Sequence, residues 1–435
     1  MKKSLIALAV LGALSGAASA QSSVTLYGII DAGLQWNESG VNKGSSAAPN
    51  WSQESAWSID SGYQSGSRFG LRGSEALGAN WAAVFTLEGG FDLSTGTSLQ
   101  GTLATGQWCQ NATTGAVTTT STTCPTGTTR IGTVPATPSQ PRLFGRQAWV
   151  GLQHSAFGTI AVGRIATPSS GTGAFDLFGN VDPFQTGWGL ASLGSTFIPS
   201  STLREDNSII WASPSWAGFK FAAQYSGNVD GSESAPQGTN TSAFNLGANW
   251  TWGPLFLAAT YDVIQYADAG SANRPAAGNS DQKMLQLGGS FDFKFLKVHA
   301  AYADQSDISA AQTLSGVGGA PQTFVPAGIG NWNNTGWMLG VTVPLFGGSI
   351  LGSYQYSDAK NIVSATGAQF EPDYSVWGIG YTYPFSRRTN MYVGYAQREW
   401  DGRITATTAA GGGALSYMSQ AFDRSQFALG VRHLF

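Results

Sequence analysis

The chain has 435 residues, of which only 11% are charged and 12% are aromatic, and its formal net charge is −3. Soluble domains usually carry about 25% charged residues, so this composition argues against an ordinary soluble protein, and the mild acidity argues against a nucleic-acid binder. No run of about 18 apolar residues follows the first 20 positions, which excludes membrane-spanning helices there. Abundant aromatic residues, 58 glycines and a mean hydropathy of −0.07 are instead typical of a membrane β-barrel, in which lipid-facing and lumen-facing residues alternate.

Residues 1–20 predict an export signal. Lys2 and Lys3 precede a short apolar run, and the run ends in the small-residue pattern Ala-Ser-Ala at Ala20. The run is shorter than an ordinary transmembrane helix, although a retained membrane anchor is the alternative. We therefore expect a signal peptide over 1–20 and a single barrel over 21–435, because no linker divides the remainder.

The first segments after the leader alternate as membrane strands do. In residues 24–36, Val24 and Leu26 share one parity, whereas Tyr27 and Asp31 share the other. Successive side chains of a strand point to opposite faces, so the apolar parity predicts the lipid side and the polar parity predicts the interior. The same interpretation of residues 80–91 and 218–226 adds two further inward charges. We expect these charged side chains to face the lumen: Asp31, Glu88 and Lys220.

The segment SRFGLRG, residues 67–73, carries two cations beside two apolar side chains. On a helix these groups would mix, but on a strand Phe69 and Leu71 share one face while Arg68 and Arg72 share the other. In a soluble protein, burying the apolar face of this strand and exposing its cationic face would not explain the surrounding scarcity of charge. In a membrane barrel, lipid receives the apolar face and lumen water solvates both arginines, so we expect Arg68 and Arg72 to line the lumen.

Two cysteines, Cys109 and Cys124, lie in one stretch rich in glycine, threonine and serine. In an exported protein this arrangement favours a disulfide that closes a long loop, with two free thiols as the alternative. Two cysteines without a neighbouring histidine make a poor zinc site. We expect no metal and no cofactor.

Two later strands extend the basic face. In RQAWVGL, assigning Trp149 to lipid turns Arg146 inward. In REDNSIIWAS, assigning Trp211 to lipid turns Arg204 and Asp206 inward. The alternation therefore predicts four lumen-facing arginines near the starts of neighbouring strands. The simpler alternative for each is a solvated lumen charge with no special role.

The connections between strands alternate in length. Short ones such as SEALGAN, PSWAG, WGPL and PFSRRT are rich in glycine, proline and serine, as tight turns require. Eight long polar segments lie between them and imply sixteen strands: 37–65, 92–141, 166–203, 227–241, 266–281, 305–332, 358–372 and 401–422. A soluble β-sandwich would need more charge on its outer face, and a solenoid would show a fixed repeat.

Aromatic residues near the strand ends match the girdles at which amphipathic rings sit at the headgroup level. Any one of them could instead be a core aromatic, so the inference rests on their number and placement. They are Trp36, Trp81, Trp149, Trp252, Trp377 and Tyr383.

Several segments, in this order, resemble the Gram-negative general porin family, in particular the porins of β-proteobacteria. They are SVTLYGIIDAGL, SRFGLRGSEALG, LFGRQAWVGLQHSAFGTIAVGR, LREDNSIIWASPSWAGFKFAAQY, FSRRTNMYVGYAQ and the terminal FALGVRHLF. The resemblance covers essentially the whole mature chain. It implies sixteen antiparallel strands with short periplasmic turns and long extracellular loops, a homotrimer in outer-membrane lipid and lipopolysaccharide, and passive diffusion of small hydrophilic solutes.

The resemblance also implies that the third long loop, roughly Ala166–Leu203, folds into the lumen and narrows it. Its carboxylates, Asp176 and Asp182, would then face a basic wall. The family's wall arginines match Arg68, Arg72, Arg146 and, with less similarity, Arg204. Clustered cations that face carboxylates would create a transverse field, and the cations predict an anion preference.

The last strand ends in Phe435 and resembles the family's recognition signal for the outer-membrane assembly machinery, with lipid-facing packing as the simpler alternative. Other functions are a substrate-selective porin of the same fold, or a non-conducting barrel that serves as an adhesin or a surface enzyme. The only histidines are His154, His299 and His433, and none lies near a G-x-S-x-G motif or a spaced set of metal ligands. We therefore do not expect an enzyme.

Overall fold

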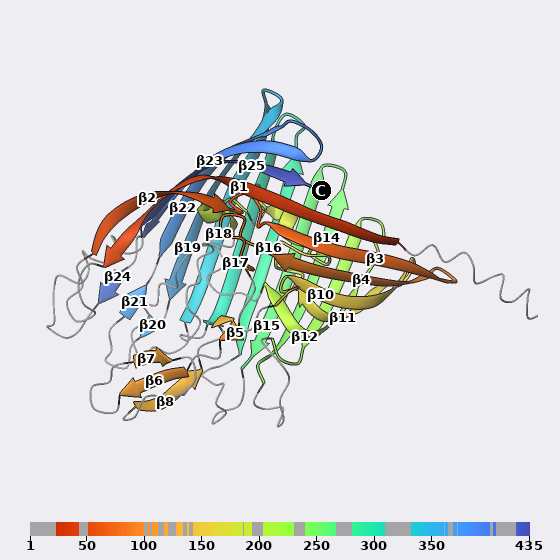
Figure 1. Ribbon diagram of the computed structural model, residues 1–435, viewed down its shortest axis with the longest axis horizontal. Helices are drawn as coiled ribbons and strands as arrows, with labels where there is room; N and C mark the ends of the chain where they lie inside the picture. Colours follow the sequence, from red (N-terminus) through yellow and green to blue (C-terminus); the bar gives the residue numbers. More distant parts are fainter. Residues whose placement is uncertain are drawn as a thin grey trace, which may run out of the picture.

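The computed structural model describes most of the chain after the leader. The described residues are 23–42, 51–99, 103–104, 107–111, 117–120, 128–133, 137–138, 142–185, 187–193, 203–229, 240–266, 281–308, 332–360, 362–363, 369–371, 373–400, 403–405 and 423–435. Long antiparallel strands dominate them, and the strands run strongly tilted side by side (Figure 1). Within this part of the chain, no helix is long and apolar enough to cross a membrane.

Sixteen strands form a closed antiparallel ring, which confirms the predicted fold class. Each strand pairs with the next along the chain, and the last pairs with the first. In order they are β1 (Ser23–Asn42), β3 (Arg68–Gly78), β4 (Trp81–Gly90), β10 (Gln147–His154), β11 (Gly158–Ala166), β12 (Arg204–Ala212), β13 (Phe219–Ser226), β14 (Ser242–Trp252), β15 (Leu255–Gln265), β16 (Gln282–Asp292), β17 (Lys297–Ile308), β18 (Trp332–Leu345), β19 (Gly348–Lys360), β22 (Tyr374–Pro384), β23 (Thr389–Trp400) and β25 (Arg424–Leu434).

The first connection is shorter than predicted because its arms are strands. β1 continues to Asn42, and β2 (Trp51–Ser61) pairs with its distal half. β3 pairs with the proximal half of β1, over Ser23–Ile29, so β2 and β3 lie end to end along the same side of β1. Residues 62–67, which join β2 to β3, turn away from β1 and enter the inside of the barrel.

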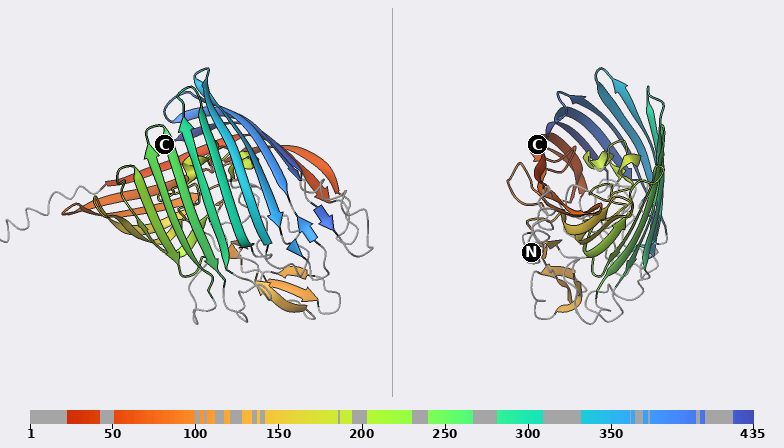
Figure 2. Two further views of the ribbon diagram at one scale, coloured as in Figure 1. Left: turned by 180° about the vertical axis from the view of Figure 1, so that it is seen from behind. Right: turned by 90° about the vertical axis from the view of Figure 1, so that its right-hand side faces the viewer.

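The lengths of the connections match the prediction. Seven short turns lie at one end, at residues 79–80, 155–157, 213–218, 253–254, 293–296, 346–347 and 385–388, and the long connections lie at the other end. Short strands occur within three long connections: β5 (Leu103–Ala104), β6 (Gln107–Asn111), β7 (Val117–Thr120), β8 (Thr128–Thr133), β9 (Thr137–Pro138), β20 (Ile362–Val363), β21 (Gln369–Glu371) and β24 (Arg403–Thr405). Figure 2 shows these small sheets beyond the ends of the large strands.

The barrel is apolar outside and polar inside. Outward side chains such as Leu26 and Ile379 are 61% and 51% exposed, whereas the inward Gln286 is 0% exposed. Burial of polar rather than apolar groups is the pattern that lipid selects. The predicted girdle residues Trp81, Trp252, Trp377 and Tyr383 all expose their rings.

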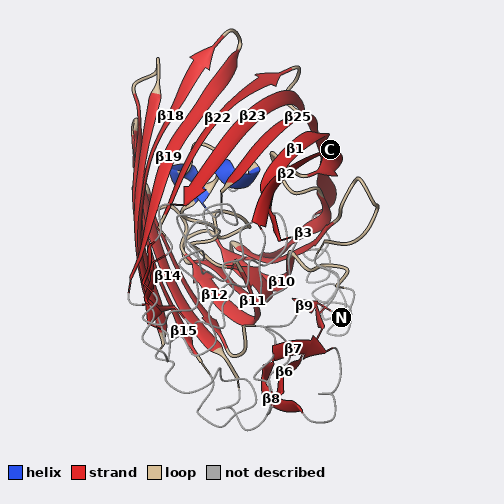
Figure 3. Ribbon diagram, turned by 90° about the vertical axis from the view of Figure 1, so that its left-hand side faces the viewer, coloured by secondary structure: helices blue, strands red, loops and turns tan. Residues whose placement is uncertain are grey.

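The connection between β11 and β12 lies inside the ring. It contains two short 3₁₀ helices, η1 (Gly179–Val181) and η2 (Gly189–Ala191). Figure 3 shows both helices on the concave side of the strands. We call the described residues 167–185 and 187–193 of this connection the inner loop.

Candidate functional site

A row of inward side chains crosses six neighbouring strands at one level of the barrel. Cross-strand pairing aligns Tyr27, Gly70, Glu88 and Gln147 on β1, β3, β4 and β10, and on the next two strands it pairs Ile165 with Glu205. A Cβ atom at Gly70 would lie 2.7 Å from the Tyr27 ring, so glycine there lets the ring lie flat across β3. The Tyr27 hydroxyl donates a hydrogen bond to Glu88 Oε2 at 3.0 Å. Glu88 therefore faces the lumen side, as its parity predicts.

Glu88 is the centre of a buried ion pair. Arg146 Nε lies 2.7 Å from Glu88 Oε1, and both side chains are more than nine-tenths buried. Charge-assisted hydrogen bonds of this length are among the stronger polar contacts in proteins. Arg146 thus faces the interior, but not for the reason that the alternation of β10 predicts.

The predicted orientation of Trp149 was wrong. Trp149 is 8% exposed and packs on Phe175 of the inner loop, with ring centroids 5.0 Å apart, whereas Val150 is exposed. Both parities of β10 carry apolar residues, so alternation alone could not say which face meets lipid. Arg146 reaches the interior because it lies in a bend before β10, outside the alternation of the strand.

Three further predicted arginines surround this ion pair. Arg68 interacts electrostatically with Arg146 and Glu88, and Arg72 lies over the Tyr27 ring at 5.3 Å. Arg204 interacts electrostatically with Arg146, Glu88 and Arg68. Among the described residues, none of Arg68, Arg72 and Arg204 forms an ion pair. The interior therefore carries a cluster of cations around one carboxylate.

The inward position on β12 belongs to Glu205, which corrects the predicted parity of Arg204 and Asp206. Between the pairs Gly163–Ser208 and Ile165–Glu205, β12 contains one more residue than β11, which is a β-bulge. A bulge reverses the alternation of faces along its strand. The alternation counted from Trp211 towards the start of β12 therefore no longer holds for the residues before Asn207, whose φ is 49°.

Asp206 instead joins two arginines that sequence analysis missed. Its carboxylate accepts from Arg142 Nη2 at 2.9 Å and from Arg164 Nη1 at 2.6 Å. Strict alternation places Arg164 with the outward Ile160 and Val162, so parity gave no reason to include it. Arg164 and Asp206 lie near the long-connection ends of β11 and β12, and Arg142 lies in the connection before β10.

A second charged group lies where the barrel closes. Asp31 is fully buried and accepts from the Tyr392 hydroxyl and the Ser65 amide, both at 2.6 Å. Its cross-strand partner on β25 is Arg432, another inward cation that the sequence reading missed. The third predicted inward charge, Lys220, is exposed and pairs across the strands with Asn249, whose amide contacts the inner loop.

The inner loop lies flat against the wall of the barrel. Glycines at six inward positions would place a Cβ atom within 3 Å of this loop: Gly247, Gly288, Gly340, Gly378, Gly380 and Gly394. Polar wall groups fasten it as well. His299 Nδ1 lies 3.0 Å from Val181 O, and Gln355 Nε2 donates to Ala191 O at 2.7 Å.

Asp176 and Asp182 do not face the arginine cluster, contrary to the expectation. Asp176 accepts from the amides of Gly171, Phe178 and Gly179, and Asp182 accepts from those of Phe184 and Leu193. Asp182 is 4% exposed, and neither carboxylate forms an ion pair with a described residue. Burial raises the pKa of each to about 6. These acids hold the shape of the loop.

The strand break at residues 62–67 contacts the far end of the inner loop. The Tyr63 ring stacks on Tyr392 at 5.9 Å and meets Trp188 edge-on at 6.0 Å. The Trp188 amide donates to the Tyr63 carbonyl. The sequence pattern predicts Tyr63 within the long connection 37–65, because nothing in the alternation marks a segment that leaves a strand.

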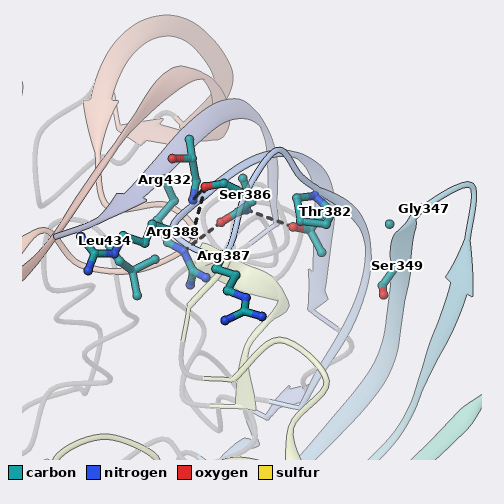
Figure 4. A pocket seen from close by; sticks show the side chains of 12 residues that line it. Gly347, Ser349, Thr382, Ser386, Arg387, Arg388, Arg432 and Leu434 are labelled. Atoms are coloured by element: carbon teal, nitrogen blue, oxygen red, sulfur yellow. Dashed lines mark hydrogen bonds between the residues drawn. The ribbon is translucent and has the colours of Figure 1, made fainter.

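A cavity of about 280 Å³ lies at the short-turn end of the barrel. Figure 4 shows the labelled Arg387, Arg388 and Arg432 around it, with hydroxyl groups of the neighbouring turn. Arg432 donates to Asn390 Oδ1 at 3.1 Å and to Ser65 Oγ at 3.0 Å. Basic groups thus occur both at this end and at the level of Glu88.

Two predicted features concern the ends of segments. Phe435 pairs with Gly28 through two backbone hydrogen bonds of 3.2 and 3.1 Å, which complete the β1–β25 seam. The predicted disulfide between Cys109 and Cys124 lies outside the described residues, because position 124 is not among them.

Comparison with known proteins agrees with this closed, polar-lined barrel. The family model described as "Gram-negative porin" matches residues 7–403. The chain belongs to the Gram-negative porin family. An outer membrane porin protein of Bordetella pertussis is 32% identical over 417 residues, covering 90% of this chain and 93% of the relative. The major outer membrane protein P.IB of Neisseria gonorrhoeae is 27% identical, covering 90% of this chain and 92% of the relative.

Solved porins share the fold. The structure named as an anion-selective porin from Comamonas acidovorans has a TM-score of 0.60 at 18% identity, covering 95% of this chain and 100% of that one. By its family and its relatives, this porin is an outer-membrane barrel. Of the three histidines among the described residues, His154 stacks on Phe157, His299 hydrogen-bonds the inner loop, and His433 hydrogen-bonds Thr389.

Proposed function

We propose that this porin is a passive, anion-preferring channel for small hydrophilic solutes, assembled as a homotrimer after removal of residues 1–20. The observation that carries the anion preference is the cation cluster around Glu88. Arg146 pairs with Glu88, Arg68 and Arg204 interact electrostatically with the same carboxylate, and Arg72 lies over the neighbouring Tyr27 ring, so this cluster has more cations than carboxylates. Rings of fixed charge set ion selectivity in a water-filled pore.

Arginine suits this role because its guanidinium keeps its charge at any physiological pH and is weakly hydrated. An anion that passes exchanges part of its water shell for several donors without forming a long-lived complex. No step needs a catalytic group, so we propose no enzymatic activity. The opposing charges lie on the wall itself, at Glu88, Asp31 and Asp206, rather than on the inner loop as predicted.

Recordings in planar bilayers test this function. Protein refolded without lipopolysaccharide should produce conductance steps in groups of three, and a salt gradient should give a zero-current potential of the sign expected for anions. The change Arg68→Gln with Arg204→Gln should move that potential towards cations, and it breaks no ion pair with a residue that the structure describes. Lys283→Gln removes a charge from the exposed outward face and is the matched control.

Non-conducting protein would overturn the channel, and single rather than triple steps would overturn the trimer. A zero-current potential unchanged by the double substitution, or changed equally by Lys283→Gln, would show that the arginine cluster does not set selectivity.

A further inference from the structure

Two adjacent arginines lie in the short turn between β22 and β23, where the proposed selectivity of the channel gives them no role. Arg387 and Arg388 are both exposed, and their segment, PFSRRT, predicts no more than a tight turn. With Arg432 of β25 they surround the cavity of about 280 Å³ at the short-turn end (Figure 4). Pockets for small ligands begin at about this size, near 300 Å³. We call this cavity the arginine pocket.

The strand residues of the arginine pocket point into the barrel. Asn390 is buried, and its Nδ2 donates to Gln64 Oε1 at 2.8 Å. Arg432 Nη1 donates to Ser65 Oγ at 3.0 Å. Both acceptors belong to residues 62–67, which lie inside the barrel between β2 and β3. The arginine pocket is therefore on the lumen side of the wall, where a ligand arrives through water rather than through lipid.

The lining of the arginine pocket contains three cations and no carboxylate. Its twelve residues include Arg387, Arg388 and Arg432 but no aspartate or glutamate. Arg432 interacts electrostatically with Asp31, which lies outside the lining. Within the part of the chain that the structure describes, neither Arg387 nor Arg388 forms an ion pair. Clustered cations of this kind attract an anion, and a multiply charged anion most strongly.

Two hydroxyl groups of the arginine pocket can donate hydrogen bonds to a ligand. Ser386 Oγ accepts from the amides of Arg388 and Thr389, at 3.1 and 3.0 Å. Thr382 Oγ1 accepts from Asn390 Nδ2 at 3.0 Å. Because each hydroxyl oxygen is the acceptor in these bonds, its own hydrogen is left for a further acceptor. The pocket therefore combines charged donors with neutral ones.

We propose that the arginine pocket binds the phosphate group of a small solute, either inorganic phosphate or a phosphate monoester. A phosphate monoester carries nearly two negative charges at neutral pH and presents three strong acceptor oxygens. Guanidinium groups match these oxygens with two parallel hydrogen bonds. The donors of the pocket come from β22, from the turn that follows it and from β25, so they approach from several directions. A tetrahedral phosphate suits this arrangement better than a planar carboxylate with two oxygens does.

A phosphate group can belong to a solute in the lumen or to a lipid headgroup, because the two share their chemistry. The inward orientation of Asn390 and Arg432 favours the solute. The proposal is independent of the channel function, because binding can be measured on a barrel that does not conduct. Conversely, a pocket that binds no phosphate would leave the selectivity of the cluster around Glu88 unaffected.

Calorimetric titration of the refolded mature protein, in phosphate-free detergent at neutral pH and constant chloride concentration, tests the pocket. Sodium phosphate should saturate a single site per chain, and sodium acetate should bind about tenfold more weakly or less. Arg387→Gln should weaken phosphate binding about tenfold, because the pocket loses one charged donor. Lys294→Gln removes one cation from another exposed short turn at the same end, so this matched control should bind phosphate as the wild type does.

No binding of phosphate to the wild type, or equal binding to the wild type and Arg387→Gln, would overturn the proposal. Equal weakening by Lys294→Gln would do the same, because it would indicate a general attraction to that end of the barrel.

Titration of the protein in lipid nanodiscs distinguishes the two sources of phosphate. Binding of sodium phosphate should persist when phosphatidic acid replaces part of the phosphatidylcholine, because headgroups do not reach a pocket on the lumen side. Binding that disappears only in the nanodiscs with phosphatidic acid would assign the pocket to a lipid headgroup and contradict the proposed solute.

Discussion

At the scale of single residues, the interior combines ion-paired arginines with arginines that form no ion pair within the described part of the chain. Arg146 is held by Glu88, whereas Arg72 lies exposed over the Tyr27 ring. Breaking a buried pair leaves an uncompensated charge, while an exposed cation in the lumen loses little when removed. The two arginines should therefore differ in what they contribute to stability, although sequence analysis gave them one role.

Replacing Arg146 by methionine tests this difference. Arg146→Met should lower the free energy of unfolding by about 3 kcal/mol, because Glu88 stays buried without its charge-assisted hydrogen bond from Arg146. Arg72→Met should change it by about 0.5 kcal/mol or less. Urea unfolding of protein inserted in lipid vesicles, followed by tryptophan fluorescence, measures both. Adding Glu88→Gln to Arg146→Met should restore part of the loss; equal costs for the two single variants would contradict the assignment.

At the scale of elements, the inner loop is placed by shape rather than by charge. Its carboxylates bind its own amides, and its apolar residues pack on wall glycines. Protein interiors are close-packed, so a surface without side chains on the wall lets the loop approach the strands closely. The loop thereby leaves space for the channel on its other side.

A methyl group on this glycine surface should displace the loop. In Gly380→Ala the new Cβ would lie 2.6 Å from the Trp188 ring. Overpacking of this kind costs about 1–3 kcal/mol, and the loop can only move towards the lumen, so single-channel conductance should fall. In Gly352→Ala on β19 the nearest atom, of Val341, is 3.4 Å away, so this control should conduct normally. Identical conductance of the two variants would argue against the packing role.

At the scale of the whole molecule, one seam closes the barrel. β1 pairs with β25 over Ile29–Leu434 to Ser39–Arg424, and Phe435 extends the seam to Gly28 through its backbone. A closed ring leaves no unpaired strand edge in the lipid, where each unsatisfied backbone group costs several kcal/mol. The side chain of Phe435 takes no part in these hydrogen bonds, so its proposed role in assembly is separable from closure.

Phe435→Ala separates the two roles. The substitution keeps the backbone pairing with Gly28, so the yield of unassisted refolding in detergent should change little. If the ring is read by the assembly machinery, the amount of the variant in the outer membrane of cells should fall severalfold. Heat-dependent mobility on gels reports folding in both settings. An equal loss in both would indicate a packing role instead.

The alternating pattern that lipid imposes on membrane strands can be predicted from the sequence. Alternation with a period of two, short and long connections in turn, and scarce charge predicted sixteen strands with an apolar outside, because each is a local consequence of a strand in lipid. Other features depend on contacts between residues that are distant in the sequence. A bulge in β12 places Glu205 rather than Arg204 at the inward position, and Trp149 faces inward because it packs on Phe175. Asp176 and Asp182 accept hydrogen bonds from backbone amides of the inner loop. Alternation fixes which residues share a face, but only packing against the inner loop and the opposite wall fixes what that face meets.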